Sequence, residues 1–494
     1  MSQEYDLIVV GYGAAGAAAA ITAAQSGARV AIIEKQPQDK HYSSTRMSGG
    51  LIMGANDVET ATRYLDACAE GMIPTSVNRA WAERAVRLPQ WLRSVGIESV
   101  VMAGGWHPQL DGFESIDVFA PLPRGVDPAS VEVELPPPGE LRFKFPLPYG
   151  NGDMLHEQLL EAVDKEKSID CFFGHAAKRL LREDDRINGL VCSSDGGEVI
   201  FKTKHGVVLA CGGFEQDQDM ILNYLKAYPI YFYGSKANTG DGIRMAQAVG
   251  ADLWHMNQMI GRAVMRVAHP DGWESTFSPS LNPPGYAILD KHGRRFANEH
   301  LQAVSKAHFY YELLQYDAEE LGYPRIPAYW VFDKKRLEAR AIAHGGLGYY
   351  QWSKDNRQEI DLGWIKEGAT IAEAARAAGM LDPEEAERTI SDYNNACTSG
   401  VDIHGRPADS LIPIDEPPYY CVPVYPGGAT TNGGPRRDEK ARILDAFGDP
   451  IPGLFGAGEL GGAIGVLYPS PGANLGEALA FGAIAAETAL SANQ

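Results

Sequence analysis

Runs of apolar residues at the start of the chain predict a strand, a helix and a second strand, in that order. Residues 6–10 and 29–34 are apolar runs of strand length, and the alanine-rich run 14–24 between them has the length of a helix. Gly27 stands where that helix would end. The pattern therefore predicts one β-α-β unit.

Periodic apolar positions predict further elements in the first half of the chain. Residues 57–70, with Asp57 as N-cap, and residues 76–94 have the spacing of amphipathic helices. Residues 206–216 predict a buried strand that ends in a Gly-Gly pair, and residues 236–253 predict a loop that enters a helix.

The pattern changes in the middle of the chain. Residues 100–150 are rich in glycine and proline with little periodicity, so we expect an irregular excursion near the active site. Residues 286–299 alternate like a β-hairpin that turns at 291–293, and residues 370–380 and 382–398 predict helices.

Helix start signals support the last two helices. Thr370 and Glu373 have the spacing of a capping box, in which each side chain binds the other residue's main-chain N–H. Asp382, Pro383 and Glu385 supply an N-cap, a proline in the first turn and an acidic residue behind it.

Charge and composition exclude several classes of protein. The 494 residues carry a formal net charge of −20, and such a surface repels phosphate backbones, so we expect no nucleic-acid partner. No uninterrupted apolar run reaches the length of a membrane span. The six cysteines are scattered without a CxxC pair, and no basic leader precedes the first strand. We expect a cytoplasmic protein with reduced thiols and no metal site.

A glycine motif at the first strand end indicates a nucleotide site. Gly11, Gly13 and Gly16 form G-x-G-x-x-G at the start of the predicted helix. The first glycine permits a tight turn, and the second lets a pyrophosphate approach the backbone beside Ala14 and Ala15 at the positive helix end. The third lets helix and strand pack closely.

The end of the second strand narrows the type of nucleotide. Glu34 follows the last motif glycine by 18 residues, the spacing of an acidic residue that accepts hydrogen bonds from ribose hydroxyls. Its charge would repel a 2′-phosphate, so NADP is disfavoured. Lys35 beside it completes this part of the predicted site.

A small-residue turn suggests FAD. Ser48, Gly49 and Gly50 resemble a turn of the fumarate reductase and 3-ketosteroid dehydrogenase flavoprotein family, where it lies against the isoalloxazine ring. Members that bond the flavin covalently carry a histidine six residues before the first glycine of this pair. Here that position is Ser43, and His41 is out of register. The resemblance therefore implies non-covalent FAD.

Other stretches resemble the same family in the same order. By this resemblance Gly212 and Asp241 border the flavin, and Glu459, after the strand predicted in 448–462, binds the ribitol hydroxyls. Asn474 and Leu475 begin a helix whose positive end would point to the flavin pyrimidine.

These motifs, in this order along the chain, predict an α/β fold. It has a Rossmann-type doubly wound FAD-binding domain split by an inserted α+β cap, the catalytic domain. We place the FAD-binding domain at 1–262 and 425–494 and the cap, with substrate contacts, at 263–424.

The cationic groups of a carboxylate site are largely missing. Fumarate reductases of this family hold their substrate with histidine and arginine, because guanidinium matches carboxylate bidentately. The corresponding positions here are Thr430 and Asn474, and Arg336 lies one residue away from the third. A buried dicarboxylate would be left unpaired, which disfavours fumarate as substrate.

The last glycine-rich stretch resembles the 3-ketosteroid dehydrogenases instead. In that group a tyrosine, and a glycine four residues later, hold the ketone oxygen, and Tyr468 and Gly472 match these positions. A phenol O–H and a main-chain N–H form a neutral oxyanion hole that suits a ketone. Ser470 resembles the Tyr-x-Ser arrangement of the 4,5-dehydrogenating enzymes, where the pair belongs to a proton relay.

One expected tyrosine is absent. Ketosteroid dehydrogenases carry a catalytic tyrosine shortly after the hairpin motif, where this chain has Gln302 or Ala303. Tyr310 and Tyr311 follow later and could replace it, although each could equally pack in a helix core. We take Tyr311 as the candidate.

The preferred interpretation is an FAD-dependent dehydrogenase that acts on a CH–CH bond next to a ketone, most simply a 3-ketosteroid. The alternative is a related enzyme that acts on a carboxylic acid, of the fumarate, urocanate or tricarballylate type. That alternative needs a cationic pocket, for which the candidates are Arg262, Arg266, Arg294, Arg295 and Arg336.

A third interpretation is a flavin-stabilised scaffold without activity. No haem or iron–sulfur motif is present, so electrons would leave to an external acceptor.

Overall fold

The computed structural model describes residues 3–132, 152–301, 306–343, 350–465 and 467–491. The chain divides into two compact units. The first comprises Met1–Leu225, Ser235–Met259 and Thr430–Gln494, and the second comprises Lys226–Gly234 and Ile260–Ala429. The domain limits inferred from the sequence stay a prediction.

A mostly parallel sheet forms the centre of the first unit. Its strand order is β21-β22-β11-β2-β3-β7. The strands are β2 (Leu7–Val10), β3 (Val30–Ile33), β7 (Ile169–Phe172), β11 (Val207–Leu209), β21 (Arg442–Leu444) and β22 (Pro450–Gly456). All pairs are parallel except the one between β21 and β22. β2, β3 and β11 are buried throughout, as in parallel sheets covered on both faces.

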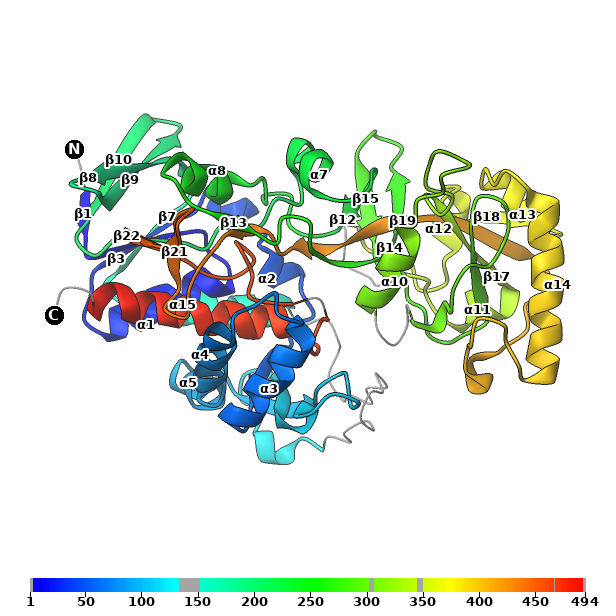
Figure 1. Ribbon diagram of the computed structural model, residues 1–494, viewed down its shortest axis with the longest axis horizontal. Helices are drawn as coiled ribbons and strands as arrows, with labels where there is room; N and C mark the ends of the chain where they lie inside the picture. Colours follow the sequence, from blue (N-terminus) through cyan, green and yellow to red (C-terminus); the bar gives the residue numbers. More distant parts are fainter. Residues whose placement is uncertain (1–2, 133–151, 302–305, 344–349, 466, 492–494) are drawn as a thin grey trace. The chain divides into compact units, whose positions relative to one another are not determined.

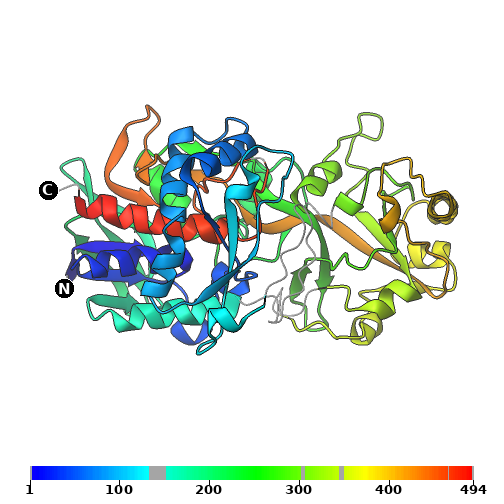
Figure 2. The same cartoon turned by 90° about the horizontal axis from the view of Figure 1, so that it is seen from below.

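Two helices from opposite ends of the chain lie side by side in this unit. They are α1 (Ala14–Gln25) and α15 (Ala473–Ser491), drawn in blue and red in Figures 1 and 2. A Cβ on Gly482 would lie 3.2 Å from the Ala18 Cβ and would overlap the Ala15 carbonyl oxygen. The alanine-rich composition thus serves close helix packing. None of the described helices combines the length and apolar character that crossing a membrane requires.

Smaller elements complete the first unit. A sheet of order β4-β6-β5 and another of order β1-β10-β9-β8 flank the centre, and β13 pairs with β20. The strands are β4 (Ile52–Ala55), β6 (Ile116–Pro121), β5 (Ser99–Ala103), β1 (Gln3–Tyr5), β10 (Gly197–Thr203), β9 (Arg186–Ser194), β8 (Ala176–Glu183), β13 (Leu253–Trp254) and β20 (Gly434–Pro435). The helices are α2 (Ser44–Met47), α3 (Val58–Ala69), α4 (Thr75–Ala85), α5 (Leu88–Ser94), α6 (Gly152–Lys165), α7 (Gln218–Tyr224) and α8 (Asp241–Ala248).

The second unit is built on a mixed sheet. Its strand order is β15-β14-β19-β17-β16, and β12 and β18 also pair with β19. The strands are β12 (Tyr231–Phe232), β14 (Met259–Ala268), β15 (Glu274–Phe277), β16 (Tyr286–Leu289), β17 (Ala328–Asp333), β18 (Lys366–Gly368) and β19 (Tyr419–Thr431). The helices are α10 (Lys306–Leu313), α11 (Lys334–Ala339), α12 (Arg357–Asp361), α13 (Ile371–Ala377) and α14 (Pro383–Ser399). Trp330, Phe332 and Phe309 are fully buried in its core.

Three predicted elements differ from the structure. Residues 76–94 form two helices, because Pro89 has no N–H with which to continue α4. Residues 116–121 form strand β6 within the excursion expected to be irregular, whose residues 133–150 lie outside the described chain. The hairpin expected at 286–299 is reduced to one bridge, between Leu289 and Arg295, since β16 pairs with β17 instead.

Two of the predicted helix caps are present in the structure, and the third is not. Asp57 accepts a hydrogen bond of 2.9 Å from a main-chain N–H in the first turn of α3, and both bonds of the Thr370–Glu373 capping box are present, so these predictions are confirmed. Asp382 precedes α14 but makes no capping bond. Its carboxylate lies 2.6 Å from Nδ1 of His292 instead, and this contact raises the pKa of His292.

Candidate active site

The glycine-rich loop after β2 has a conformation and a packing that favour glycine. Gly11 has φ of +100°, and a Cβ there would lie 2.5 Å from the Ala210 carbonyl oxygen. A Cβ on Gly16 would overlap the Gly11 carbonyl oxygen. Gly13 is the half-buried, extended N-cap of α1. The loop thus places the start of α1 at the carboxyl end of the central sheet, where α/β folds bind nucleotides.

The start of α1 retains donors for an anion. The N–H of Ala14 donates to the Thr45 hydroxyl at 2.8 Å, which satisfies one group of the first turn. Among the hydrogen bonds of the described residues, none uses the N–H of Ala15 or Gly16. These two groups and the positive helix end can bind a pyrophosphate.

Glu34 is held in place by main-chain donors. It is buried and accepts hydrogen bonds from the N–H groups of Tyr12 at 3.1 Å and Gln36 at 2.8 Å. The His41 ring stacks on the Tyr12 ring at 5.7 Å between centroids. His41 Nε2 lies 3.7 Å from the Glu34 carboxylate, and burial lowers the pKa of His41. His41 therefore belongs to the surroundings of Glu34.

Two other predicted cofactor residues contact each other. Lys35 Nζ donates to the Asp241 carboxylate and to the Thr239 hydroxyl, both at 2.6 Å. Asp241 is the first residue of α8. The carboxylate lies where the positive helix end stabilises it, and the ion pair joins β3 to this helix.

The predicted flavin turn is closed by its own serine. Ser48 Oγ donates to the Thr45 carbonyl at 2.7 Å and accepts from the Gly50 N–H at 3.0 Å. Gly50 has φ of +70°, and Gly49 before it is half-buried. Ser43, at the position of the covalent histidine, caps α2 with its hydroxyl.

Gly212 lies close to a polar side chain at the end of β11. It has φ of +75°, and a Cβ there would lie 2.6 Å from the Asn238 Oδ1 atom. Asn238 in turn donates to the Ser44 hydroxyl at 3.1 Å. The close approach leaves no room for a side chain at this position.

The buried carboxyl group of Glu215 and the half-buried one of Glu459 lie near the end of β22. Glu215 accepts from the N–H and hydroxyl of Thr431 at 2.7 and 3.1 Å, and burial raises its pKa to about 6. Glu459 accepts from the Asn474 amide at 3.3 Å. Burial and the charge of Glu215 raise the pKa of Glu459 to about 8. The raised pKa favours the protonated form of Glu459, which can both donate and accept hydrogen bonds.

Tyr468 lies in the turn that leads into α15. Its hydroxyl accepts a hydrogen bond of 3.4 Å from the Asn474 N–H, at the positive end of the helix. Its ring packs against the Trp106 ring at 5.6 Å between centroids, and its carbonyl accepts from Nε2 of His107 at 3.1 Å. These contacts fix both the ring and the backbone of Tyr468.

The two positions that would carry a cationic clamp contact each other. The Asn474 amide donates to the Thr430 hydroxyl at 2.9 Å, within reach of Tyr468 through the Asn474 N–H. Both side chains are neutral, so this part of the site offers hydrogen bonds without positive charge.

The rest of the turn is held tightly by the strand beside it. Gly472 has φ of +79°, and a Cβ there would lie 2.5 Å from the carbonyl group of Leu51. Its carbonyl accepts from the Met53 N–H at 3.0 Å, whereas none of the hydrogen bonds among described residues uses its own N–H. Ser470 is fully buried and donates to the next carbonyl at 3.1 Å, and Leu475 is buried.

The candidate tyrosines of the second unit differ in exposure. The Tyr310 ring is buried against Gly261, whereas Tyr311 is 39% exposed. Burial raises the pKa of both phenols, so both are protonated at neutral pH. Gln302 and Ala303 lie outside the described residues.

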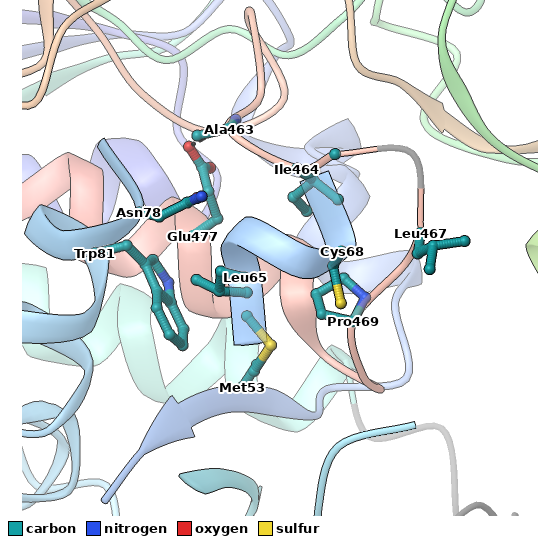
Figure 3. Close-up of a pocket in the computed structure, with 11 residues that line it drawn as sticks. Met53, Leu65, Cys68, Asn78, Trp81, Ala463, Ile464, Leu467, Pro469 and Glu477 are labelled. Carbon is teal, nitrogen blue, oxygen red and sulfur yellow. Dashed lines mark hydrogen bonds between the residues drawn. The ribbon is translucent and has the colours of Figure 1, made fainter. Parts of the chain in front are cut away.

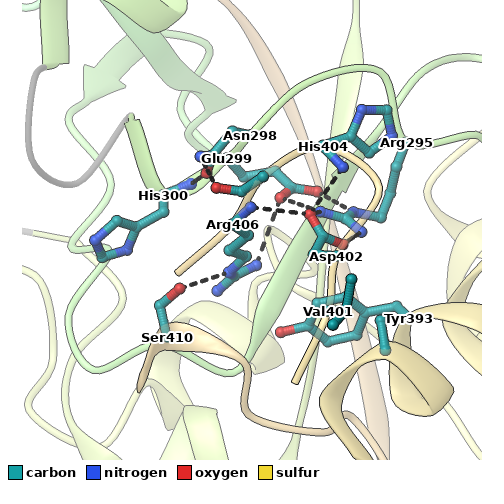
Figure 4. A network of polar contacts seen from close by, with 12 residues as sticks. Arg295, Asn298, Glu299, His300, Tyr393, Val401, Asp402, His404, Arg406 and Ser410 are labelled. Atoms are coloured by element: carbon teal, nitrogen blue, oxygen red, sulfur yellow. Dashed lines mark hydrogen bonds and ion pairs between the residues drawn. The ribbon is translucent and has the colours of Figure 1, made fainter. Parts of the chain in front are cut away.

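Two candidate arginines of the second unit are neutralised by nearby carboxylates. Arg295 contacts both oxygens of Glu299 and the carboxylate of Asp402, each at 2.5 Å at the shortest, in a buried network (Figure 4). Arg266 pairs with Glu274 at 2.5 Å. These guanidinium groups are already matched by charge, which disfavours their use for a substrate carboxylate.

The other arginines have no carboxylate partner among the described residues. Arg294 is exposed. Arg336 is buried and binds main-chain carbonyl groups, including that of Ser280, and burial lowers its pKa to about 10. Arg262 donates to the Ser278 hydroxyl at 2.9 Å and lies over the Tyr233 ring. Among the candidate arginines, Arg262 is thus partly exposed, is fixed by a hydrogen bond and a ring contact, and has no carboxylate partner among the described residues.

A small cavity lies beside the Tyr468 turn (Figure 3). Its lining includes Leu65 and Cys68 of α3, Trp81 of α4, and Pro469 of the turn. Its volume of about 10 Å³ corresponds to one water-sized sphere. The cavity is therefore too small for a substrate.

Comparison with known proteins decides the family. A family model described as an FAD binding domain matches residues 6–475. The chain belongs to this family. It is an FAD-dependent oxidoreductase, and the predicted resemblance and α/β flavoprotein fold are confirmed.

The relatives include members of both groups that the motifs resemble. The 3-oxosteroid 1-dehydrogenase of Mycolicibacterium smegmatis is 27% identical, over 98% of this chain and 97% of the relative. The probable fumarate reductase Ifc3 of Shewanella frigidimarina is also 27% identical, over 99% and 75%. The structure of 3-ketosteroid delta1-dehydrogenase from Sterolibacterium denitrificans superposes with a TM-score of 0.82 at 22% identity, over 99% of this chain and 100% of that one.

The described residues fit FAD. Buried polar atoms without a partner among them include Asn474 Oδ1, Glu215 Oε2 and His41 Nε2, which lie beside predicted cofactor residues. A cofactor rich in hydroxyl and phosphate groups would supply partners for these atoms. The two N–H groups of α1 suit an anion, and the Glu34 carboxylate suits ribose hydroxyls.

Several residues of this region escaped prediction. Tyr64, Trp106 and His107 stand in no recognised motif, whereas Thr45 and Glu215 lie inside stretches that resemble the family without being marked by them. The partners of all five are distant in sequence. The only local signal is the Gly-Gly-Trp-His run after β5, which glycine content alone marks as a turn.

Replacement of Gly16 by alanine should weaken FAD binding. The new methyl group would overlap the Gly11 carbonyl, and such overpacking costs about 1–3 kcal/mol, which corresponds to roughly 5- to 150-fold in affinity if it acts on the bound state. FAD dissociation constants measured by fluorescence test this. Gly196→Ala is the matched control, because a Cβ at this turn position of the first unit would meet nothing closer than 3.8 Å and Gly196 has no positive φ. Equal affinity of Gly16→Ala and wild type would contradict the packing argument.

Proposed function

We propose that the protein is a 3-ketosteroid dehydrogenase, which removes a proton α to the ketone and a hydride from the β carbon. The observation that carries the proposal is the Tyr468 turn. It presents a phenol hydroxyl, bonded to the start of α15, beside a neutral Asn474–Thr430 pair. A neutral hydrogen-bonding site suits an uncharged ketone better than a carboxylate.

The chain's own groups would polarise the ketone. Tyr468 would donate its phenol proton to the ketone oxygen, and the Gly472 N–H would donate from the same turn. Withdrawal of charge onto that oxygen acidifies the neighbouring C–H bond. Tyr311 stays our candidate for the proton acceptor. It can accept the α-proton only as the phenolate, so its own proton must leave first, and burial, which raises its pKa, opposes that loss.

The cofactor would be held by the first unit. Bound FAD supplies the hydride acceptor. Ala15, Gly16 and Glu34 would hold the pyrophosphate and ribose, and the protonated Glu459 would bind ribitol hydroxyls. We further propose a cytoplasmic enzyme that passes its electrons to an external acceptor.

Turnover of a steroid panel tests the function. Purified enzyme is incubated with 1,2- and 4,5-saturated 3-ketosteroids and an artificial electron acceptor, and acceptor reduction and product are followed. We expect turnover of at least one ketosteroid and none of its 3-hydroxy counterpart, which lacks the polarised oxygen. Absence of turnover with every 3-ketosteroid would refute the proposal.

A carboxylic-acid substrate is the second candidate. Arg262 favours it, because this cation is held by Tyr233 and Ser278 with no acidic partner among the described residues. Fumarate that reoxidises the photoreduced flavin, together with loss of this reaction in Arg262→Gln, would establish the alternative.

We propose that FAD is bound without a covalent link. Ser43 cannot form the histidyl bond, and His41 is packed on Tyr12 beside Glu34. Acid precipitation should therefore release essentially all flavin into the supernatant, measured by absorbance. Yellow colour retained in the washed, denatured pellet would show a covalent bond.

A further inference from the structure

A buried tyrosine of α3 contacts the turn that carries Tyr468. Tyr64 has no exposed surface, and its hydroxyl donates to the Pro469 carbonyl at 2.7 Å. Its oxygen also accepts from the N–H groups of Trp106 at 3.1 Å and His107 at 3.2 Å. A phenol has one proton and two lone pairs, so all its hydrogen-bonding capacity is used here.

The loop after β5, which contains Trp106 and His107, also contacts Tyr468 directly. The Trp106 N–H donates to the Pro469 carbonyl at 2.9 Å, and the Trp106 ring packs on the Tyr468 ring. His107 Nε2 donates to the Tyr468 carbonyl. Gly105 has no room for a side chain, because a Cβ there would lie 2.8 Å from a carbonyl oxygen and 3.1 Å from the Tyr64 hydroxyl.

We propose that Tyr64 is a positioning residue, which sets the place of the Tyr468 hydroxyl by joining the Pro469 carbonyl to the 106–107 backbone. The proposal rests on the proposed function of Tyr468. Its physical basis is that one oxygen joins three segments, α3, the loop after β5 and the turn before α15, which the sequence separates widely. Loss of this oxygen releases the turn without removing any group that touches substrate.

Tyr64→Phe keeps the ring and removes only the oxygen. The His107 N–H then loses its bond to the Tyr64 oxygen, and the Pro469 carbonyl loses the hydroxyl donor while the Trp106 N–H still donates to it. We expect kcat with a 3-ketosteroid to fall about tenfold and KM to change less than about threefold, because orientation in the transition state is lost before binding. A rise in KM with unchanged kcat would overturn the proposal.

A double-mutant cycle separates positioning from general weakening. If Tyr64 acts through Tyr468, the Tyr64→Phe/Tyr468→Phe enzyme has the same kcat as Tyr468→Phe alone. If the two losses multiply, to about 10³-fold, Tyr64 does not act through Tyr468 and the proposal is wrong.

Tyr393→Phe is the matched control. Tyr393 is also buried and donates its hydroxyl to a main-chain carbonyl, that of Ile412 at 3.0 Å, in the second unit. It should lower the denaturation midpoint as Tyr64→Phe does and leave kcat unchanged. If Tyr64→Phe and Tyr393→Phe lower kcat equally, the loss comes from removing any buried tyrosine hydroxyl. It then does not come from release of the Tyr468 turn.

A spectroscopic readout keeps the inference independent of the substrate. The protein is labelled with ¹³Cζ-tyrosine and examined by NMR. The Tyr468 resonance is assigned as the one that disappears from the spectrum of Tyr468→Phe. It should shift in Tyr64→Phe and stay in place in Tyr393→Phe. If no ketosteroid is turned over, the proposed function fails while this test still judges the positioning. An unmoved Tyr468 resonance in Tyr64→Phe would overturn the positioning itself.

Discussion

We expect Tyr468→Phe to lower kcat for a 3-ketosteroid about 10²-fold or more, with a much smaller change in KM. The reason is that its hydroxyl would hold the ketone oxygen as negative charge develops there, and one such donor contributes on that scale. Phenylalanine preserves the ring contact with Trp106, so the turn keeps its packing. The loss therefore reports the hydroxyl alone.

Stopped-flow measurement of flavin reduction by substrate provides the test. Tyr316→Phe is a suitable control, because Tyr316 is 56% exposed in the second unit and belongs to none of the proposed site. Dithionite should reduce the flavin of Tyr468→Phe at the wild-type rate, since this reaction needs no ketone. An unchanged kcat in Tyr468→Phe would exclude the oxyanion role.

The largest loss of stability should come from Arg437→Met. Arg437 and Glu477 form a buried ion pair, and Arg437 also donates to the carbonyl groups of Gly456 and Gly458 at the end of β22. Removal of the cation leaves Glu477 charged and unpaired in the interior, or forces it to take up a proton. Breaking such a pair costs about 3–5 kcal/mol.

Denaturant unfolding of the FAD-loaded protein measures this cost. The Arg437→Met/Glu477→Met double variant should recover most of the loss, because two apolar side chains leave no buried charge. Arg84→Met is the control, since Arg84 pairs with the exposed Glu487 and such surface pairs contribute about 0–1 kcal/mol. A loss below about 1 kcal/mol for Arg437→Met would contradict the buried-charge argument.

The FAD-binding family could be predicted from the sequence because the chemistry of its nucleotide motif is local. Gly11, Gly13 and Gly16 act through their own backbones, and Glu34 follows them at a spacing fixed by one strand and one helix. The positive φ at Gly11 and the lack of space at Gly16 are the physical reasons that the motif survives as a sequence pattern.

The substrate side could be predicted only in part. Tyr468 and Gly472 share one turn, so their proximity follows from the sequence. The partners of Tyr468 do not, because Trp106 and His107 reach it from a loop far along the chain. Likewise, Arg295 could be proposed as a carboxylate ligand until its contacts with Glu299 and Asp402 showed that its charge is matched.

Local patterns in the sequence thus predicted the family, a nucleotide-binding unit and the polar turn before α15, since each prediction depends on residues within one or two elements. Only the tertiary structure decided which neutral and charged groups surround that turn. It placed Asn474 on Thr430, raised the pKa of Glu459 by burial beside Glu215, and linked Tyr64 to Pro469. Burial and long-range hydrogen bonds depend on which segments meet in space, and no short pattern in a single chain encodes that.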